Sequence, residues 1–546
     1  MAERQGLKAG RAIGRRIGPL LSAAALLAGC TVGPNFRAPS FWSPASWFAS
    51  RPKPAQTLPS VTVAAPLNPN WWEAFHDPIL TSLEDRIASD NLDVRTATVR
   101  LAESRAQRSI VSADEFPQVN GNASYTREKA SARGLLGLAS GSAGSAASGA
   151  SQGTVANGSG FGAGGIPGQS AGLQPFNLWQ YGFDASWELD LWGRVRREIE
   201  SAGASVEASA EARRDTLLSV MAELARDYIE LRGLQRNLQI TQENLKTQES
   251  SLQLTRARYA GGLTSDLDVA NAAAQVASTA ALIPNLQQRI EQEINRLSFL
   301  LAEPPGALRG MLEEARPVPP VPPVVPIGLP SELARRRPDI REAEAKLHAA
   351  TADIGVATAD FYPQVTLSGS LGIQSLQFKD LANWGARQYA LGPGITLPIF
   401  QGGRLRGTLE LRKEQQKEAA LDYQQTVLQA FHDVDNALIA YRAEQRRREE
   451  LATAVQQNRR AVALAQSRYQ QGITDFLEVL DAQRSLLAAE EEYSNSTTTV
   501  STNLVQLYKA LGGGWESAYP LPGSTLNAEE HAPTGHRAAP AAPGTI

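Results

Sequence analysis

The sequence predicts an α+β membrane protein with a duplicated strand-strand/long-helix unit, in which three chains form a trimeric 12-stranded β-barrel continuous with a 12-column α-helical barrel. Three observations predict this fold: segments that recur at constant spacing, strands that alternate polar and apolar residues, and very long helical stretches. The chain has 546 residues, and its 53 basic and 56 acidic side chains give a net charge of −3. It therefore lacks the basic excess that is typical of nucleic-acid binders.

Residues 1–29 have the pattern of a secretory signal peptide, with a basic start followed by an apolar run from Ile17 to Ala28. The run is shorter than the ~20 residues that a membrane-spanning helix needs. It ends in Leu27-Ala28-Gly29-Cys30, which resembles the lipobox of bacterial lipoproteins, and Cys30 is the only cysteine of the chain. We therefore expect cleavage before Cys30 and attachment of lipid, including palmitate, to its sulfur.

The sequence contains an internal duplication. Ala113–Val119 recurs as Ala359–Val365 at an offset of 246, and Arg258–Thr264 recurs as Arg468–Thr474 at an offset of 210. The difference, 246 − 210 = 36 residues, places an insertion in the first repeat. It falls in the Gly/Ser/Ala-rich stretch 127–174, whose composition predicts a flexible, exposed loop.

This duplication divides the chain into six parts. They are a lipoprotein signal peptide (1–29), a lipidated N-terminal segment with equatorial packing (30–77), a first repeat (78–301), a Pro-rich inter-repeat linker (302–330), a second repeat (331–515) and a disordered C-terminal tail (516–546).

Each repeat contains two strands with a period of two residues. They cover about 118–126 and 181–191 in the first repeat, and about 364–374 and 389–399 in the second. A length of ~10 residues is that of a transmembrane strand, although a strand of a soluble sandwich would look alike in isolation. Aromatic residues near the strand ends favour the membrane. Three acidic residues on one polar face are expected to line a channel: Asp184, Glu188 and Asp190.

The helical pattern is continuous from Arg194 to Arg258 and again from Arg404 to Arg468. Such a helix of ~65 residues would be roughly 95–100 Å long, whereas globular helices average about 11–12 residues. Shorter helices are expected at about Pro78–Ala113, Asp266–Leu301, Ser331–Ala359 and Asp475–Leu511. Two of these shorter helices placed end to end have the length of one long helix. The spacing of the apolar residues predicts coiled-coil packing.

The number of strands predicts the assembly. Four strands cannot close a barrel, and an open sheet edge cannot lie in lipid. Two chains would give eight strands, whose interior is filled by side chains. Three chains give twelve strands with room for water, above twelve helical columns. The expected assembly is therefore a trimeric conduit.

Six short motifs of the chain point to a known family: Cys30–Phe36, Trp71-Trp72, Leu329–Leu333, Arg337–Ile340, Phe361–Gln364 and Leu397–Arg404. Together they resemble the motifs of the outer-membrane efflux factors, the TolC-like channels, in their OprM/NodT-type lipoprotein branch, and the resemblance covers Cys30 to Trp515. It implies a barrel in the cell outer membrane and a helical tunnel across the periplasm. It also implies efflux of drugs or other small solutes, and hence multidrug resistance, without a catalytic site or a cofactor. The implied partners are a periplasmic membrane-fusion adaptor and an inner-membrane pump of the RND type.

The turns at Arg258–Asp268 and Arg468–Glu478 connect the long helices to the following ones. Glycines should cap the helix ends, and Thr264 and either Thr474 or Asp475 should cap the helix starts. A plain helix–helix turn would explain the pattern, but the resemblance implies that these tips also contact the adaptor. The tip residues are Gly261, Gly262, Leu263, Thr264, Gly472, Ile473 and Thr474.

Leu477 and Asp481 match the leucine and aspartate that constrict the entrance in this family. Three copies of each would form an apolar ring and a carboxylate ring that favours cations. The alternative is an ordinary surface pair at i and i+4 on a helix. The counterparts in the first repeat are Leu267 and Asn271, so the carboxylate ring would be threefold.

Two other functions fit the same fold: an outer-membrane channel for type I protein secretion and a non-conducting envelope tether. An enzyme is not expected, because no nucleotide-binding P-loop, HExxH zinc motif or nucleophile elbow is present. His348 and His432 occur singly on helices, so we interpret both as structural and expect no metal site.

Overall fold

The computed structural model describes residues 31–40, 43–47, 58–129 and 175–519. The predictions for the signal peptide, Cys30, residues 130–174 and the tail beyond Tyr519 lie outside the described residues. The chain divides into two compact units. The sheet unit comprises Met1–Pro34, Ser109–Ile199 and Ala352–Arg412, and the helical unit comprises Asn35–Arg108, Glu200–Thr351 and Lys413–Ile546.

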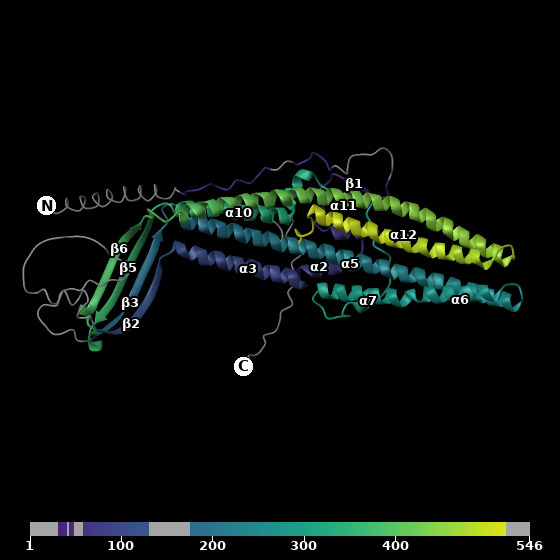
Figure 1. Cartoon of the computed structure of the whole chain (residues 1–546), viewed down its shortest axis with the longest axis horizontal. Helices are drawn as coiled ribbons and strands as arrows, with labels where there is room; N and C mark the ends of the chain where they lie inside the picture. Colours follow the sequence, from purple (N-terminus) through teal and green to yellow (C-terminus); the bar gives the residue numbers. More distant parts are fainter. Residues whose placement is uncertain (1–30, 41–42, 48–57, 130–174, 520–546) are drawn as a thin grey trace, which may run out of the picture. The chain divides into compact units, whose positions relative to one another are not determined.

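The sheet unit contains one antiparallel sheet with the strand order β2-β3-β5-β6 (Figure 1). Its strands are β2 (Gln118–Glu128), β3 (Phe176–Leu189), β5 (Gln364–Ser375) and β6 (Arg387–Thr396). These are the four predicted strands, but β6 ends three residues before the predicted end at Ile399. Pro398 lies in the lost portion and cannot donate a backbone hydrogen bond. Pro393 lies within β6, opposite Leu367, on a strand that is at the edge of the sheet of the single chain.

The two hairpins of the sheet have the same register. Gln118 pairs with Ser186 in the first hairpin, and Gln364 pairs with Thr396 in the second. The first members of these pairs are 246 residues apart and the second members 210 apart, which are the two offsets of the sequence repeat. The duplication therefore extends to individual backbone pairs, and it leaves β2 and β6 as the edges.

The N-terminal segment is held at the corner where β3 leads into α5 (Arg194–Ala260). The backbone N–H of Val32 donates to the Trp192 carbonyl over 3.0 Å. Gly193 adopts a φ of 82°, and a Cβ there would lie 2.7 Å from the Thr31 side chain. These contacts place Thr31, and with it the chain just after Cys30, at the helix-joined end of the sheet.

The long helices are confirmed as α5 and α11 (Arg404–Gln470), each of 67 residues. Among the described residues, no helix is both long and apolar enough to cross a bilayer. Of the shorter predicted helices, only the last is continuous, as α12 (Phe476–Leu511). The others are divided into α2 (Pro78–Asp90) and α3 (Leu92–Ser112), α6 (Asp266–Ala280) and α7 (Leu282–Leu300), and α9 (Leu333–Arg336) and α10 (Pro338–Ala359).

Local chemistry explains these breaks. Asn91 restarts a helix, because its side chain accepts hydrogen bonds from the backbone N–H groups of Asp93 and Val94 over 2.9 and 3.1 Å. Pro338 disfavours a helical conformation at Arg337. Pro284 has no N–H for the carbonyl four residues earlier, at the end of α6.

Asn91 and Arg337, which lie at two of these helix breaks, are equivalent in the two repeats. The side chain of each donates a hydrogen bond to a carbonyl at the end of the last helix of its repeat. Asn91 donates to the Leu300 carbonyl over 2.7 Å, and Arg337 donates to the Ala510 carbonyl over 3.1 Å. The two carbonyls are themselves 210 residues apart, so the anchoring contact was duplicated together with the helices.

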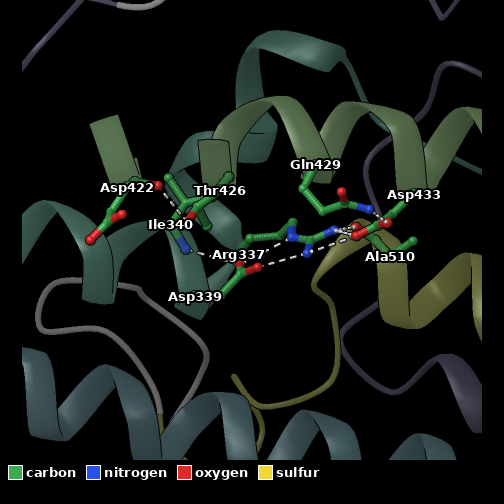
Figure 2. Close-up of polar contacts among 8 residues, drawn as sticks. All are labelled: Arg337, Asp339, Ile340, Asp422, Thr426, Gln429, Asp433 and Ala510. Carbon is green, nitrogen blue, oxygen red and sulfur yellow. Dashed lines mark hydrogen bonds and ion pairs between the residues drawn. The ribbon is translucent and has the colours of Figure 1, made fainter. Parts of the chain in front are cut away.

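Arg337 makes further contacts that Asn91 cannot make, as Figure 2 shows. Its guanidinium donates to both carboxylate oxygens of Asp339, over 3.0 and 2.7 Å. It also donates to Asp433 on α11 over 3.2 Å, and the Gln429 side chain donates to the other oxygen of Asp433 over 2.7 Å. One arginine thus joins α10, α11 and α12.

Two regions are more structured than the sequence predicts. In the linker, β4 (Val324–Pro326) pairs in parallel with β1 (Val61–Val63), and α8 (Arg309–Leu312) adds a helical turn. The sequence predicts a disordered tail from residue 516 onward, but Tyr519 packs under the Arg213 guanidinium at 3.8 Å. The remaining short elements are the 3-10 turns η1 (Trp71–Phe75), η2 (Ala113–Glu115), η3 (Pro330–Glu332), η4 (Phe378–Asp380) and η5 (Trp384–Ala386).

The main core of the helical unit forms around α5. Trp71 and Phe75 of η1 are buried in it together with Leu224 of α5, Leu438 of α11 and Leu504 of α12. Trp71 stacks on Tyr508 with ring centroids 5.3 Å apart. Residues 71–75, which precede the first repeat, therefore pack within the helical unit, and the equatorial position of this segment stays a prediction.

Candidate channel and docking surfaces

The two helix–helix turns, α5–α6 and α11–α12, have the same backbone geometry and lie at one end of the helical unit (Figure 1). The N–H of Leu263 donates to the Arg258 carbonyl over 2.8 Å, and the N–H of Ile473 donates to the Arg468 carbonyl over 2.9 Å. Gly262 and Gly472 adopt φ values of 73° and 74°, where other residues are strained. Both predicted glycine caps are therefore confirmed.

The first helix start differs from the prediction by one residue, and the second lies at one of the two predicted cap residues. Ser265, not Thr264, is the N-cap of α6, and it forms a capping box with Asp268. Burial acts to raise the pKa of Asp268, but hydrogen bonds from Thr264 and Ser265 hold it below its ordinary value. In the second turn the cap position is Asp475, without a side-chain hydrogen bond.

The tips expose apolar side chains in matching positions. Leu263 and Ile473 are equivalent in the two repeats and are both exposed, as are Leu267 and Leu477 one turn into the next helices. Exposed apolar side chains gathered at one end of a molecule are typical of a docking surface. The geometry therefore suits the predicted adaptor contact, which stays a prediction.

Arg258 joins the two tips, a role that the sequence pattern does not show. Its guanidinium donates to the carbonyls of Tyr469 and Gln470, over 2.8 and 3.1 Å, and lies 4.6 Å from the Tyr469 ring. A cation there also complements the negative end of the α11 dipole. The equivalent Arg468 is exposed, and its nearest carboxylate is that of Glu478 at 4.0 Å.

Leu477 and Asp481 lie on the exposed face of α12, one turn apart. Leu477 is 57% exposed, whereas Phe476, Val479 and Leu480 on the opposite face are buried between the hairpins. Among the described residues, neither Leu477 nor Asp481 belongs to the buried cluster between the hairpins. The pair is therefore available to line an entrance, as predicted from the resemblance.

The three acidic residues expected to line a channel have different surroundings. The Arg194 guanidinium donates to both oxygens of Glu188 over 2.9 and 2.7 Å. Asp190 lies beyond the end of β3 and accepts from the backbone and side chain of Arg196 over 2.9 and 3.2 Å. Two of the three charges are therefore compensated at the strand–helix corner. Asp184, which accepts from Asn122, and Glu188, which is paired with Thr366, both keep the predicted place on the polar face of β3, whereas Asp190 does not.

The largest difference between the repeats is in burial. Leu218 and Ile229 of α5 are 3% and 0% exposed, whereas the equivalent Leu428 and Ile439 of α11 are 49% and 53% exposed. A second set of apolar residues is exposed at the other side of the repeat pair, on α3 and α7: Leu92, Val99 and Phe299. The helical unit thus has two apolar surfaces that the described part of the chain leaves exposed.

Within the described residues, one acidic group has its ligand atoms close enough together to hold a cation: Asp227, Glu230 and Glu293. Arg226 and Arg296 already contact the Asp227 carboxylate at 2.9 and 2.7 Å. Burial raises the pKa of Asp227 and that of Glu293. These ion pairs account for the cluster, and we assign no metal to it.

The two predicted structural histidines differ. The ring of His348 lies 3.0 Å from the Glu200 carboxylate and stacks on Phe36 at 4.4 Å between centroids, which is a structural role. His432 is exposed on α11. The prediction therefore holds for His348, and the exposed position of His432 does not support it.

A four-stranded sheet with one apolar face, together with paired helical hairpins that end in exposed tips, is the arrangement that the sequence predicts for a membrane channel protein. Comparison with known proteins identifies the family. The outer membrane efflux protein family matches residues 83–303 and 329–513, and the chain belongs to this family.

Individual relatives agree with this assignment. The chain is 35% identical over 490 residues to the antibiotic efflux pump outer membrane protein ArpC of Pseudomonas putida, covering 90% of this chain and 94% of ArpC. It is 31% identical over 505 residues to the outer membrane protein OprJ of Pseudomonas aeruginosa, covering 92% and 98%. The solved structure of the outer-membrane channel OprN matches with a TM-score of 0.76 and 36% identity, over 89% of this chain and all of that one.

The protein is therefore an efflux channel of the outer membrane that extends into the periplasm. Its family is one of channels and not of enzymes.

Proposed function

We propose that three copies of this chain form the channel, with a 12-stranded barrel above a 12-column helical tunnel. The observation that carries this proposal is the pair of uncovered surfaces. Leu428 and Ile439 on α11 need the cover that Leu218 and Ile229 receive within the chain. An exposed surface at each side of the repeat pair suits a head-to-tail ring, in which the first repeat of one copy covers the second repeat of the next.

The sheet edges support the same ring and give its register. Residue numbers of β3–β5 pairs add up to 554, as in Ser186 opposite Ser368. In the repeat, β6 is the counterpart of β3, 210 residues later, and β2 is the counterpart of β5, 246 residues earlier. If β6 pairs with β2 of the next copy as β3 pairs with β5, the residue numbers of each pair add up to 554 + 210 − 246 = 518. Thr396 would then face Asn122 of the neighbouring copy, and Ile395 would face Ala123. Polar residues meet polar ones and apolar residues meet apolar ones, as a barrel wall requires.

Cysteine cross-linking tests both the ring and its register. The pairs Asn122→Cys with Thr396→Cys, and Ala123→Cys with Ile395→Cys, should give covalent trimers on mild oxidation. Asn122→Cys with Gly392→Cys, which is four residues out of register, is the matched control. Light scattering of the uncross-linked protein should give the mass of three chains. A stable monomer, or equal cross-linking of the control, would contradict the proposal.

We infer that the trimer is the passive exit duct of a tripartite pump for drugs or other small solutes. The named relative ArpC belongs to an antibiotic efflux pump, which supports this substrate class. The energy would come from an inner-membrane pump of the RND type, joined through a periplasmic adaptor that contacts Leu263 and Ile473 at the tips. Expression in a strain that lacks its own channel should restore drug resistance only when adaptor and pump are present. Resistance restored by the channel alone would contradict a passive role.

The entrance is proposed to be closed by Leu477 and Asp481, three copies of each. Replacing both by alanine should increase single-channel conductance in planar bilayers and weaken cation preference. The double variant Leu267→Ala with Asn271→Ala removes the equivalent positions of the first repeat and serves as the control. Wild-type conductance and selectivity in the Leu477/Asp481 variant would place the constriction elsewhere. Absence of any conductance in the wild type would favour a tether.

Lipid attachment at Cys30 is proposed as a second membrane anchor. Metabolic labelling should transfer palmitate to the wild type and not to Cys30→Ser. The serine variant, exported by a non-lipoprotein signal, should still reach the outer membrane, because a closed barrel inserts without lipid. Palmitate label on the serine variant would show that another residue is acylated.

A further inference from the structure

The apolar face of the sheet carries only two charged residues. In every paired strand of the sheet, odd-numbered residues face odd-numbered residues, so one face is formed by the odd positions of all four strands. These positions are apolar, aromatic or small and uncharged, except for Arg127 on β2 and Arg387 on β6. Both exceptions are arginines, and each lies on an edge strand.

Both arginines also lie at the same end of the sheet, the end away from the helices. Arg127 is paired with Asn177, one residue from the end of the β2–β3 pairing, and Arg387 is paired with Ile373 in the last β5–β6 pair. Within the part of the chain that the structure describes, neither arginine forms an ion pair. Two cations on an apolar face without a carboxylate partner need an explanation.

Exposed aromatic side chains surround this end of the face. Trp384 is 75% exposed and its ring lies 4.7 Å from the Arg387 guanidinium, and Tyr389 is exposed next to it on the same face. On the other edge, Tyr125 packs on Trp179 with ring centroids 4.1 Å apart. Such aromatic residues mark the depth of the lipid headgroups. An arginine costs about 0–1 kcal/mol at that depth, against roughly 2–4 kcal/mol at the bilayer midplane.

In the proposed trimer the two edges meet, so this step rests on the proposed function. The β6–β2 register puts Arg127 of the neighbouring copy opposite Leu391 and the next odd position, Lys129, opposite Tyr389. Arg387 lies two residues further along β6. Arg127 and Arg387 are thus separated by four residues along the strands, or about 13 Å, with Lys129 between them. Each junction between copies carries a basic row of three residues on the lipid face.

We propose that this basic row binds the phosphate groups of the phosphorylated glycolipid in the outer leaflet of the outer membrane. A guanidinium donates two parallel hydrogen bonds to a phosphate, and it is less strongly hydrated than an ammonium group. Cations spaced over ~13 Å can engage more than one phosphate of the same headgroup, while the acyl chains lie on the apolar face below. The aromatic belt sets the depth, and the arginines select the anionic headgroup.

Binding of defined lipids to the purified trimer tests the proposal. The probe is a bis-phosphorylated, acylated disaccharide lipid, measured by native mass spectrometry or by titration into trimers in uncharged detergent. A contact with anionic lipid is worth about a fivefold change in affinity for each basic residue, so the variant Arg127→Gln with Arg387→Gln should bind roughly 30-fold more weakly. Arg387→Lys keeps the charge and should lose less affinity for the glycolipid than Arg387→Gln. The control Lys246→Gln with Arg256→Gln removes two exposed cations of α5 and should bind like the wild type.

Two further probes separate the sources of phosphate. After phosphatase treatment, the same glycolipid should bind to the wild type and to the double variant with equal affinity. Vesicles of phosphatidylglycerol should bind more weakly and depend less on the two arginines. Equal binding of wild type and double variant, equal binding of the dephosphorylated lipid, or equal affinity for phosphatidylglycerol would each overturn the proposal. Cysteine cross-linking of the double variant reports separately on the trimer, so loss of the ring and loss of lipid binding are distinguishable.

Discussion

Asp215 on α5 provides a test of the helical packing through pH. Burial raises its pKa to about 6, and the neighbouring carboxylates of Asp339 and Glu342 act in the same direction. Arg337 and Lys509 oppose the shift but do not cancel it. The folded chain therefore keeps the proton on Asp215 at pH values at which an unfolded chain has lost it.

The sign of the pH dependence follows from this difference. At low pH, below the ordinary value of 3.8, both states are protonated and the carboxyl group has no destabilising effect. As the pH rises from 3.8 to about 6, only the unfolded state ionises, and the free energy of unfolding falls by ~1.4 kcal/mol for each pH unit. Above pH 6 the loss is complete, at about 3 kcal/mol.

The substitution Asp215→Asn removes the ionisation and keeps the shape of the side chain. We expect the variant to be more stable than the wild type by up to about 3 kcal/mol at pH 8, and the gain to disappear near pH 4. Thermal melting followed by circular dichroism between pH 4 and pH 8 measures it. Glu249→Gln, an exposed acid on the same helix, is the control. A pH profile of Asp215→Asn parallel to that of the wild type would refute the reasoning.

Three further substitutions probe contacts seen in the structure. Arg337→Met should destabilise the helical unit by about 2–3 kcal/mol in thermal or denaturant unfolding, because it leaves two partly buried carboxylates without their cation, whereas the exposed neighbour Arg335→Met should have little effect. Leu428→Asp with Ile439→Asp should leave each chain folded but give a monomer by light scattering. A trimer of normal stability would show that this surface of α11 does not belong to the interface. Arg258→Ala should weaken the joining of the two tips by about 1–2 kcal/mol, seen as faster hydrogen exchange around the second turn, and unchanged exchange would show that the turns hold without it.

Sequence alone determined the elements whose signal repeats over many residues. The offsets of 246 and 210 predicted the duplicated hairpins, and the structure pairs Gln118 with Ser186 and Gln364 with Thr396 in agreement with both. The two long helices were also predictable, because a proline-free apolar repeat over 67 residues has few alternatives. Gly262 and Gly472 were recognisable because a left-handed turn strains other residues.

Only the tertiary structure decided features that depend on partners distant in sequence. Asn91 breaks a predicted helix because it also reaches the Leu300 carbonyl, 209 residues away. Glu188 has the pattern of a channel-lining acid, but the strand–helix corner brings Arg194 against it. Leu218 and Leu428 occupy the same position of the repeat, yet one is buried and the other exposed. A periodic sequence fixes which face of a helix is apolar, but which neighbour covers that face depends on the position of the helix in the assembled fold.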